Sequence, residues 1–272
     1  MGYLTTDKKK ITAKTLLEMK AAGEKITQMT AYDFTTASII DAAGIDSILV
    51  GDSASNVMAG NQDTTPITVD QMIYHARAVV RACHHCLVVC DMPFGSYQVS
   101  REDGIRNAIR IIKETGAGAV KMEGGKEIAD TVKGIVDAGI PVIGHLGLTP
   151  QSIHKFGGYG LRAKEDTEAA KLIEDALALD AAGVSGITLE KVPAMLANKV
   201  TAMVKAATIG IGAGHGTDGQ VLVYADALGM TSGFKPKFLR HFANVNKCMT
   251  EGVMEYIRCV KSESFPSEAE SY

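Results

Sequence analysis

Residues 117–123 read AGAVKME, a short apolar run that carries a lysine and a glutamate at its carboxyl end. Lys121 and Glu123 are two positions apart, so in an extended strand their side chains point to the same face. Ionisable residues also stand at or just past the ends of other apolar runs, namely Asp52, Asp91, His145 and Glu190. Because the carboxyl ends of the strands in a parallel barrel converge on one face, this spacing predicts an active site at one rim.

Short apolar or β-branched runs alternate with helical patterns, which is typical of repeated β/α units and a parallel sheet. Eight units would close a (β/α)8 TIM barrel, and a helix over Ala13–Ala22, with Thr12 as its cap, would close the barrel from below. The strands are expected at Ile26–Ala31, Ser47–Val50, Leu87–Cys90, Ala117–Met122, Pro141–Gly144, Gly186–Leu189, Thr208–Ile211 and Gln220–Tyr224.

Local signals predict where several helices begin and end. Ser100 and Asp103 form a capping-box pattern, and Gly116 is placed to end that helix. Thr149 followed by Pro150 predicts another helix start just beyond His145. Two further helices are expected, one with an apolar stripe at Leu172, Ala176 and Leu179 that ends at Gly183, and one over most of Lys237–Val260.

Composition limits the class of protein. The chain has 272 residues, of which 46% are apolar, so we expect one barrel domain over residues 1–272. The formal net charge of -3, without a long charged run, provides no footprint for nucleic acid or an anionic membrane, so a small-molecule partner is favoured. The first ten residues lack the apolar core of a signal peptide, and no apolar stretch approaches the roughly 20 residues of a membrane span. We expect a cytoplasmic protein.

Five cysteines suggest free buried thiols in such a protein. Residues 83–86 read CHHC and are followed by Cys90, which looks like a metal clip. Structural zinc usually takes four ligands from two separated pairs, however, and no second pair follows. We therefore interpret these cysteines as core residues.

Asp52, Asp91 and Glu123 could supply hard oxygen ligands to Mg²⁺, which binds through few carboxylates and leaves positions for substrate and water. Taken alone, Asp52 could be a turn residue between Gly51 and Ser53, and Asp91 could cap a turn. Their joint placement favours the metal interpretation.

The other candidates also have structural alternatives. Lys121 and Glu123 could form a simple ion pair, although a buried pair stabilises little once desolvation is counted. His145 could donate to substrate or be a buried core histidine. Glu190 could be a general base or form an ion pair with Lys191 or another basic side chain. The glycines of residues 210–214 (GIGAG) could admit a ligand or simply allow tight packing.

Several strings, in this order, resemble the ketopantoate hydroxymethyltransferase (3-methyl-2-oxobutanoate hydroxymethyltransferase) family. They are LVGDS at 49–53, VKMEGG at 120–125, GHLGLTPQS at 144–152 and IGIGAG at 209–214, with FGGY at 156–159 and TDGQVLV at 217–223 as further matches. The resemblance runs from about Lys10 to the C-terminal tail.

The resemblance implies a barrel of the phosphoenolpyruvate mutase type that transfers a hydroxymethyl group from 5,10-methylenetetrahydrofolate to 3-methyl-2-oxobutanoate, giving 2-dehydropantoate for pantothenate biosynthesis. It further implies a Mg²⁺-stabilised enolate, a homodecamer and a set of residue roles. Those roles are Mg²⁺ ligation by Asp52, Asp91 and Glu123, substrate contacts from Asp52, Ser53, Asp91 and Lys121, and Glu190 as the base, with His145 assisting.

Three other readings compete with this one. Lys121 could form a Schiff base, but three nearby carboxylates favour a protonated ammonium. A metal-dependent lyase or mutase of the same barrel group would typically carry a Lys-Lys-Cys-Gly-His loop, which is absent here. A catalytically silent barrel used for binding or assembly is the third reading, since fold alone does not establish activity.

Overall fold

A computed structural model describes residues 10–231, 233 and 235–272. The N-terminal residues 1–9, on which part of the expectation about a leader segment rests, lie outside the described residues. The chain divides after Leu222 into two compact units, a barrel unit and a C-terminal unit that starts at Val223. The single-domain expectation stays a prediction.

Eight parallel strands form a closed barrel in which each strand pairs with the next and β8 pairs with β1, as predicted. The strands are β1 (Ile26–Thr30), β2 (Ser47–Val50), β3 (Leu87–Asp91), β4 (Ala119–Glu123), β5 (Val142–Gly147), β6 (Gly186–Glu190), β7 (Ala207–Ile211) and β8 (Gly219–Leu222). The main boundary error is in β5, which continues three residues past the predicted end at Gly144. As a result His145 lies inside a strand.

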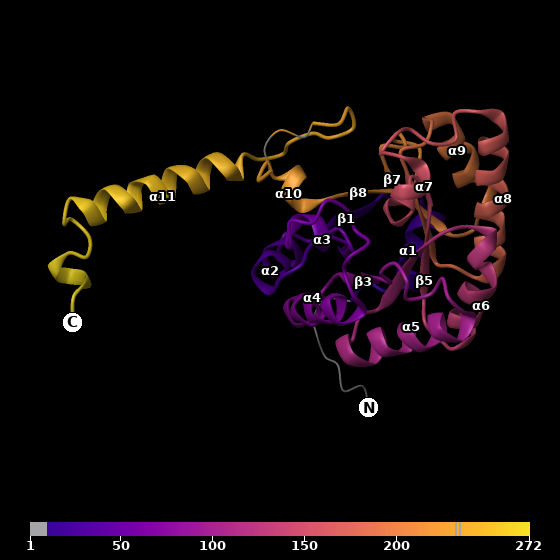
Figure 1. The fold of residues 1–272 in the computed structure, drawn as a ribbon, viewed down its shortest axis with the longest axis horizontal. Helices are drawn as coiled ribbons and strands as arrows, with labels where there is room; N and C mark the ends of the chain where they lie inside the picture. The colour runs from indigo at the N-terminus through magenta and orange to yellow at the C-terminus, as the bar shows by residue number, and fades with distance from the viewer. Residues whose placement is uncertain (1–9, 232, 234) are drawn as a thin grey trace. The chain divides into compact units, whose positions relative to one another are not determined.

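Helices lie around the outside of the strands (Figure 1). Those of the barrel unit are α1 (Ala13–Ala22), α2 (Phe34–Ala42), α3 (Ala54–Val57), α4 (Val69–Ala82), α5 (Arg101–Thr115), α6 (Ala129–Asp137), α7 (Ile153–Phe156), α8 (Asp166–Ala182) and α9 (Ala194–Met203). Short 3₁₀ turns, η1 (Lys126–Ile128) and η2 (Pro150–Ser152), precede α6 and α7.

The predicted caps are largely confirmed. Thr12 forms a capping box at the start of α1, and the Ser100 hydroxyl accepts a hydrogen bond from the Asp103 amide at the start of α5. Gly116 ends α5 in the left-handed conformation, with φ of 78°. The Thr149–Pro150 prediction needs correction, because the Thr149 hydroxyl caps nothing and the chain makes a 3₁₀ turn before α7. The proline fits this tighter turn because it is at the first position, where no amide hydrogen is needed.

Alternate strand positions fill the lower half of the barrel with apolar side chains. One buried cluster joins such positions from most of the strands to Ala13 and Leu16 of α1. Its strand members are Ile26, Leu49, Leu87, Val89, Ala119, Ile143, Ala207, Ile209 and Val221. The N-terminal helix therefore closes the barrel from below, as predicted.

The C-terminal unit contains α10 (Tyr224–Ala227), α11 (Val245–Lys261) and the turn η3 (Glu268–Glu270). The prediction that most of Lys237–Val260 is helical is confirmed, and the helix begins after Asn244, whose side chain accepts from the Lys247 amide. This late start has a local cause, because an asparagine cap satisfies an amide that a continuing helix would have bonded.

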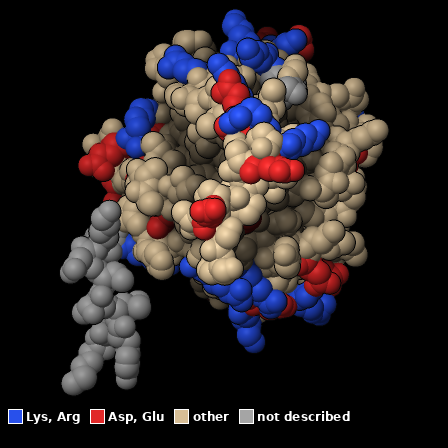
Figure 2. Space-filling view, turned by 90° about the vertical axis from the view of Figure 1, so that its left-hand side faces the viewer, with Lys and Arg blue, Asp and Glu red and all other residues tan. Residues whose placement is uncertain are grey.

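No helix among the described residues is long and apolar enough to cross a bilayer. On the face drawn in Figure 2, acidic and basic side chains lie among one another and among uncharged residues. This mixture agrees with the absence of a single-sign run in the sequence.

Candidate active site

The ionisable residues occupy the inward positions directly above the apolar cluster. Asp91 follows Val89 by two residues in β3, Lys121 follows Ala119 in β4, and His145 follows Ile143 in β5. Because side chains alternate along a strand, each charged residue shares the inward face of its apolar predecessor. The register pairs Asp91 with Lys121 and, farther up, Glu123 with His145. The predicted convergence at the carboxyl rim is therefore present.

Asp52 and Asp91 lie side by side at the ends of β2 and β3. The Asp52 amide donates to Asp91 Oδ2 at 3.0 Å. Gly51 permits this turn, because a Cβ there would lie 2.6 Å from Ser53 Oγ. The Ser53 hydroxyl in turn is 2.7 Å from the Tyr32 hydroxyl. Ser53 is thus directed by a buried tyrosine toward the same rim.

Lys121 forms a buried ion pair, with its Nζ 2.7 Å from Asp91 Oδ1. Burial alone would lower the pKa of Lys121, but the carboxylates of Asp91, Glu123 and Asp52 outweigh it and raise that pKa. The lysine is held as an ammonium.

His145 lies between two carboxylates. Its Nδ1 is 3.3 Å from Glu123 Oε1 and its Nε2 is 3.4 Å from Glu190 Oε2. Burial and Lys121 act to lower the pKa of His145, yet the two glutamates raise it to about 9. The histidine is therefore a charged link between β4 and β6 and not an inert core residue.

The alternative reading of Glu190 as an ion-pair partner holds with another basic side chain, His145, and not with Lys191. The Lys191 ammonium donates to the backbone carbonyl of Tyr159, while Glu190 faces His145. The glycines of the seventh loop have a packing role, because a Cβ on Gly214 would lie 2.5 Å from Ala194 Cβ and one on Gly210 would lie 2.6 Å from Thr217 Oγ1.

Gln151 is a site residue that residue-by-residue reasoning missed. Its Nε2 donates to Asp52 Oδ2 at 2.8 Å, and its backbone amide donates to Glu123 Oε2 at 2.9 Å. The Tyr97 hydroxyl donates to its side-chain oxygen at 2.6 Å and accepts from the Glu123 amide at 3.0 Å. The signal available in the sequence was the string GHLGLTPQS, which contains Gln151 but does not show that it reaches Asp52.

The carboxylates fit a hard divalent cation. Burial, reinforced by Asp91 and Glu123, raises the pKa of Asp52 well above its ordinary value, although Lys121 and Gln151 act in the other direction. Hence negative charge at this rim exceeds what the nearby cations balance, and Mg²⁺ among these oxygens would offset it.

These three carboxylates do not form a compact closed cage. Within the described part of the chain, one group of acidic, histidine or cysteine residues brings three ligand atoms within 4.8 Å of one another, and it lies elsewhere. Oxygens bound directly to one octahedral Mg²⁺ lie at most about 4.2 Å apart, so in this conformation one or two of the carboxylates could bind the ion directly and the rest through water.

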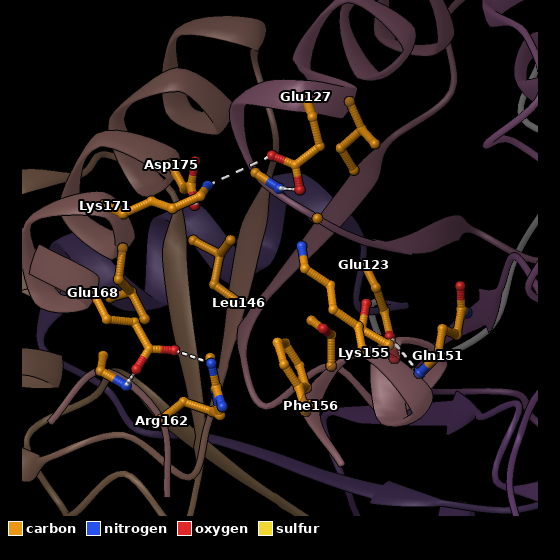
Figure 3. A pocket seen from close by; sticks show the side chains of 18 of the residues that line it. Glu123, Glu127, Leu146, Gln151, Lys155, Phe156, Arg162, Glu168, Lys171 and Asp175 are labelled. Atoms are coloured by element: carbon orange, nitrogen blue, oxygen red, sulfur yellow. Dashed lines mark hydrogen bonds and ion pairs between the residues drawn. The ribbon is translucent and has the colours of Figure 1, made fainter. Parts of the chain in front are cut away.

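A cavity of about 570 Å³ opens beside this rim and reaches Glu123, Tyr97 and Gln151. Its outer wall carries cations and acids, as Figure 3 shows. Arg162 pairs with Glu168 and lies 4.0 Å above the ring of Phe156. Lys155 extends into the open space of the cavity (Figure 3).

Comparison with known proteins gives concordant results. The model of the ketopantoate hydroxymethyltransferase family matches residues 10–268. The 3-methyl-2-oxobutanoate hydroxymethyltransferase of Flavobacterium johnsoniae is 59% identical over 272 residues and covers 100% of both chains. That of Bacteroides fragilis is 57% identical over 271 residues, covering 100% of this chain and 99% of its own.

Solved structures resemble the fold. A phosphonopyruvate hydrolase in complex with oxalate and Mg²⁺ has a TM-score of 0.61 at 11% identity and covers 96% of this chain and 93% of its own. A 2,3-dimethylmalate lyase of the phosphoenolpyruvate mutase/isocitrate lyase superfamily has a TM-score of 0.59 at 15% identity, covering 96% and 91%. The predicted barrel type is confirmed, and at these identities the likeness concerns fold alone.

Proposed function

Because the chain belongs to the ketopantoate hydroxymethyltransferase family, we propose that it transfers a hydroxymethyl group from 5,10-methylenetetrahydrofolate to 3-methyl-2-oxobutanoate. The general activity, hydroxymethyl transfer in pantothenate biosynthesis, follows from membership of the family. The proposal adds the one-carbon donor, the metal ion and the roles of individual residues. The observation that supports these assignments is that the His145 imidazole contacts both Glu190 and Glu123, which is one of the three proposed metal ligands.

Glu190 is the proposed general base. Its side chain retains 17% of its accessible surface, whereas those of Lys121 and His145 retain 5% and 4%. A base that must meet a substrate carbon needs such an opening, while residues that hold charge in place do not. His145 fixes the orientation of Glu190 by contacting Oε2.

The keto acid is proposed to bind between Lys121 and the β2–β3 rim, where Asp52, Ser53 and Asp91 meet. The Lys121 ammonium would neutralise the substrate carboxylate. Mg²⁺, held by Asp52, Asp91 and Glu123, would act as a Lewis acid toward the keto acid when bound. A C3 proton beside a ketone is weakly acidic, so removal by Glu190 depends on stabilising the enolate charge that develops.

The folate is proposed to occupy the cavity beside the rim. The cavity offers the aromatic ring of Phe94 for a flat ring system, and Lys155 and Lys171 for an acidic tail. Lys171 already pairs with Asp175, with Nζ 2.6 Å from Oδ2, so Lys155 is the better candidate for the tail.

The structural neighbours suggest a lyase or mutase as a second class, but their identity to this chain is at most 16%. Family membership across nearly the whole chain disfavours that reading. A silent barrel is disfavoured because the proposed metal carboxylates and Glu190 are all present. We retain a homodecamer in the cytoplasm as a proposal, which sedimentation velocity can test for the assembly.

The deciding experiment separates enolisation from transfer. The purified protein is incubated with 3-methyl-2-oxobutanoate in deuterated water, with and without Mg²⁺ and without folate, and C3 exchange is followed by proton NMR. We expect Mg²⁺-dependent exchange that falls by roughly 10²- to 10⁴-fold in Glu190→Gln. The matched control is Glu174→Gln, which changes an exposed glutamate on α8 and should exchange at the wild-type rate.

The outcomes discriminate between readings. Equal exchange in wild type and Glu190→Gln would remove Glu190 from the role of base. Folded, Mg²⁺-loaded protein that exchanges no C3 proton, even with tetrahydrofolate added, would overturn the proposed enolisation. Exchange that is unaffected by chelation would overturn the metal assignment while leaving Glu190 in place.

A further inference from the structure

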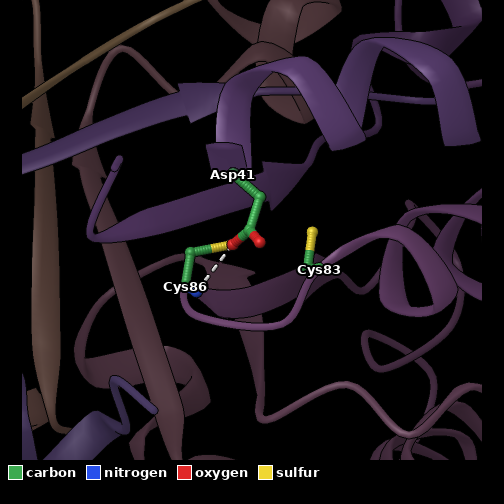
Figure 4. A group of neighbouring side chains, drawn as sticks. All are labelled: Asp41, Cys83 and Cys86. Atoms are coloured by element: carbon green, nitrogen blue, oxygen red, sulfur yellow. Dashed lines mark hydrogen bonds between the residues drawn. The ribbon is translucent and has the colours of Figure 1, made fainter. Parts of the chain in front are cut away.

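Asp41, Cys83 and Cys86 converge at the end of β3 opposite to the end that carries Asp91. Cys83 follows the last residue of α4, Cys86 immediately precedes β3, and Asp41 is in the last turn of α2. One ligand atom from each residue, two thiol sulfurs and a carboxylate oxygen, lies within 4.8 Å of the others (Figure 4). All three side chains are buried.

Asp41 is held in place by the loop that carries the cysteines. Its carboxylate accepts hydrogen bonds from the backbone amides of His84 at 2.9 Å, His85 at 3.2 Å and Cys86 at 2.9 Å. Carboxylates that ligate metals are commonly fixed by such additional hydrogen bonds. The same bonds also position the Cys86 sulfur relative to the carboxylate, because the Cys86 amide donates one of them.

The donor set selects a class of cation. Two thiolates and one carboxylate favour a thiophilic divalent ion over Mg²⁺ or Ca²⁺, which require oxygen ligands. We propose that Asp41, Cys83 and Cys86 form a binding site for a divalent cation of the zinc class, with water as the fourth ligand. The site is independent of the proposed catalytic function.

The balance of protons and charges allows a divalent cation to bind at this buried site. A hydrogen bond to Cys83 and burial raise the pKa of Cys86, which favours its neutral thiol in the metal-free protein. Binding of one divalent cation would release two protons and form two metal–sulfur bonds. The two added positive charges are cancelled by the two thiolates, so the net charge of the buried group does not change.

The competing explanation is that Asp41 only anchors the loop and the cysteines only fill space. The sequence favours that explanation because no second ligand pair follows Cys90, whereas Asp41 lies 42 residues before Cys83. Anchoring accounts for the three amide bonds of Asp41. It does not require both sulfurs to lie within reach of one ion.

Cd²⁺ is a suitable probe, because thiolate-to-Cd²⁺ charge transfer absorbs in the ultraviolet while carboxylate ligation is silent. The reduced full chain is stripped with chelator, supplied with excess Mg²⁺ to fill the carboxylate site, and titrated with Cd²⁺. We expect one absorbing Cd²⁺ per chain and release of two protons per Cd²⁺ in weakly buffered solution. Zn²⁺ should displace this Cd²⁺ stoichiometrically.

Variants identify the ligands. Cys83→Ser should halve proton release and weaken Cd²⁺ binding at least tenfold, and Cys83→Ser/Cys86→Ser should abolish the absorption. The matched control is Cys248→Ser/Cys259→Ser, which removes the two cysteines of the C-terminal unit and should bind Cd²⁺ like wild type. Far-ultraviolet circular dichroism and thermal unfolding report whether each variant is folded, independently of Cd²⁺ binding and of any enzyme activity.

Two results would overturn the proposal. One is reduced wild type that takes up no absorbing Cd²⁺. The other is absorption that persists in Cys83→Ser/Cys86→Ser. If Cys86→Ser fails to fold, Cys83→Ser alone decides the matter, since Cys83 makes none of the amide bonds to Asp41.

Discussion

The His145 imidazole contacts Glu123 on one side and Glu190 on the other, at 3.3 Å and 3.4 Å. A neutral imidazole offers no charge to these two carboxylates, whereas an imidazolium is attracted to both. The arrangement therefore favours the charged form and couples the proposed base to a proposed metal ligand. A substitution at His145 should disturb both.

The charge on His145 should appear in the pH dependence of stability of the metal-free protein. The pKa rises from an ordinary 6.5 to about 9 in the fold. The stabilisation is thus fully present below pH 6.5 and is lost as pH rises through about 9, with a magnitude on the order of 3 kcal/mol. Urea unfolding in chelator at pH 6 and pH 9.5 should show this loss in wild type and not in His145→Gln. Parallel pH profiles would contradict the assignment.

Gln151→Leu should lower both stability and metal affinity. The substitution removes the donor to the buried Asp52 Oδ2 and to the Met92 carbonyl, while the Tyr97 hydroxyl keeps its bonds to the Glu123 backbone. The expected loss is about 2 kcal/mol or more in the free energy of unfolding. Calorimetric titration with Mg²⁺ should show weaker binding, because Asp52 loses its orientation.

The control for that change is Gln98→Leu. Gln98 donates to the same Gln151 oxygen at 3.1 Å but is exposed, so water can replace it. Its loss should cost no more than about 0.5 kcal/mol. If Gln98→Leu destabilised the protein as much as Gln151→Leu, burial of the Gln151 network would not be the cause.

Lys121 should not form a Schiff base with the keto acid. Its raised pKa and its 2.7 Å contact with Asp91 keep it protonated, so it has no lone pair for attack on a carbonyl. Reduction with borohydride in the presence of 3-methyl-2-oxobutanoate, followed by peptide mapping, should show no more adduct at Lys121 than at the exposed Lys14. A stoichiometric adduct at Lys121 would favour the aldolase-like route.

The sequence was informative where function depends on strand periodicity. Asp91, Lys121 and His145 each follow an inward apolar residue by two positions. This two-residue spacing identifies the inward face even when the predicted strand ends are wrong by a few residues. The family strings added the substrate and the metal as expectations. Both kinds of inference use local information.

Contacts between distant segments could not be predicted in the same way. Gln151 reaches Asp52 across 99 positions, and Asp41 meets the loop of residues 84–86 only because α2 and α4 pack together on the barrel. The 3₁₀ turn after Thr149 is a further case, since the signals for a cap and for a tight turn are the same residues. Tertiary packing decided between them.

Gly147→Ala should destabilise the protein more than Gly139→Ala and should also impair activity. The two glycines have φ of 90° and 88°, so alanine is similarly strained at both, at about 1 to 3 kcal/mol. At Gly147 a Cβ would also lie 2.3 Å from the carbonyl oxygen of Glu190, whereas at Gly139 nothing lies within 4 Å. Relief of that overlap must move the end of β6 and with it the proposed base. Unfolding free energies and C3 exchange rates should both separate the variants, and equal values would mean that backbone conformation alone governs the two positions.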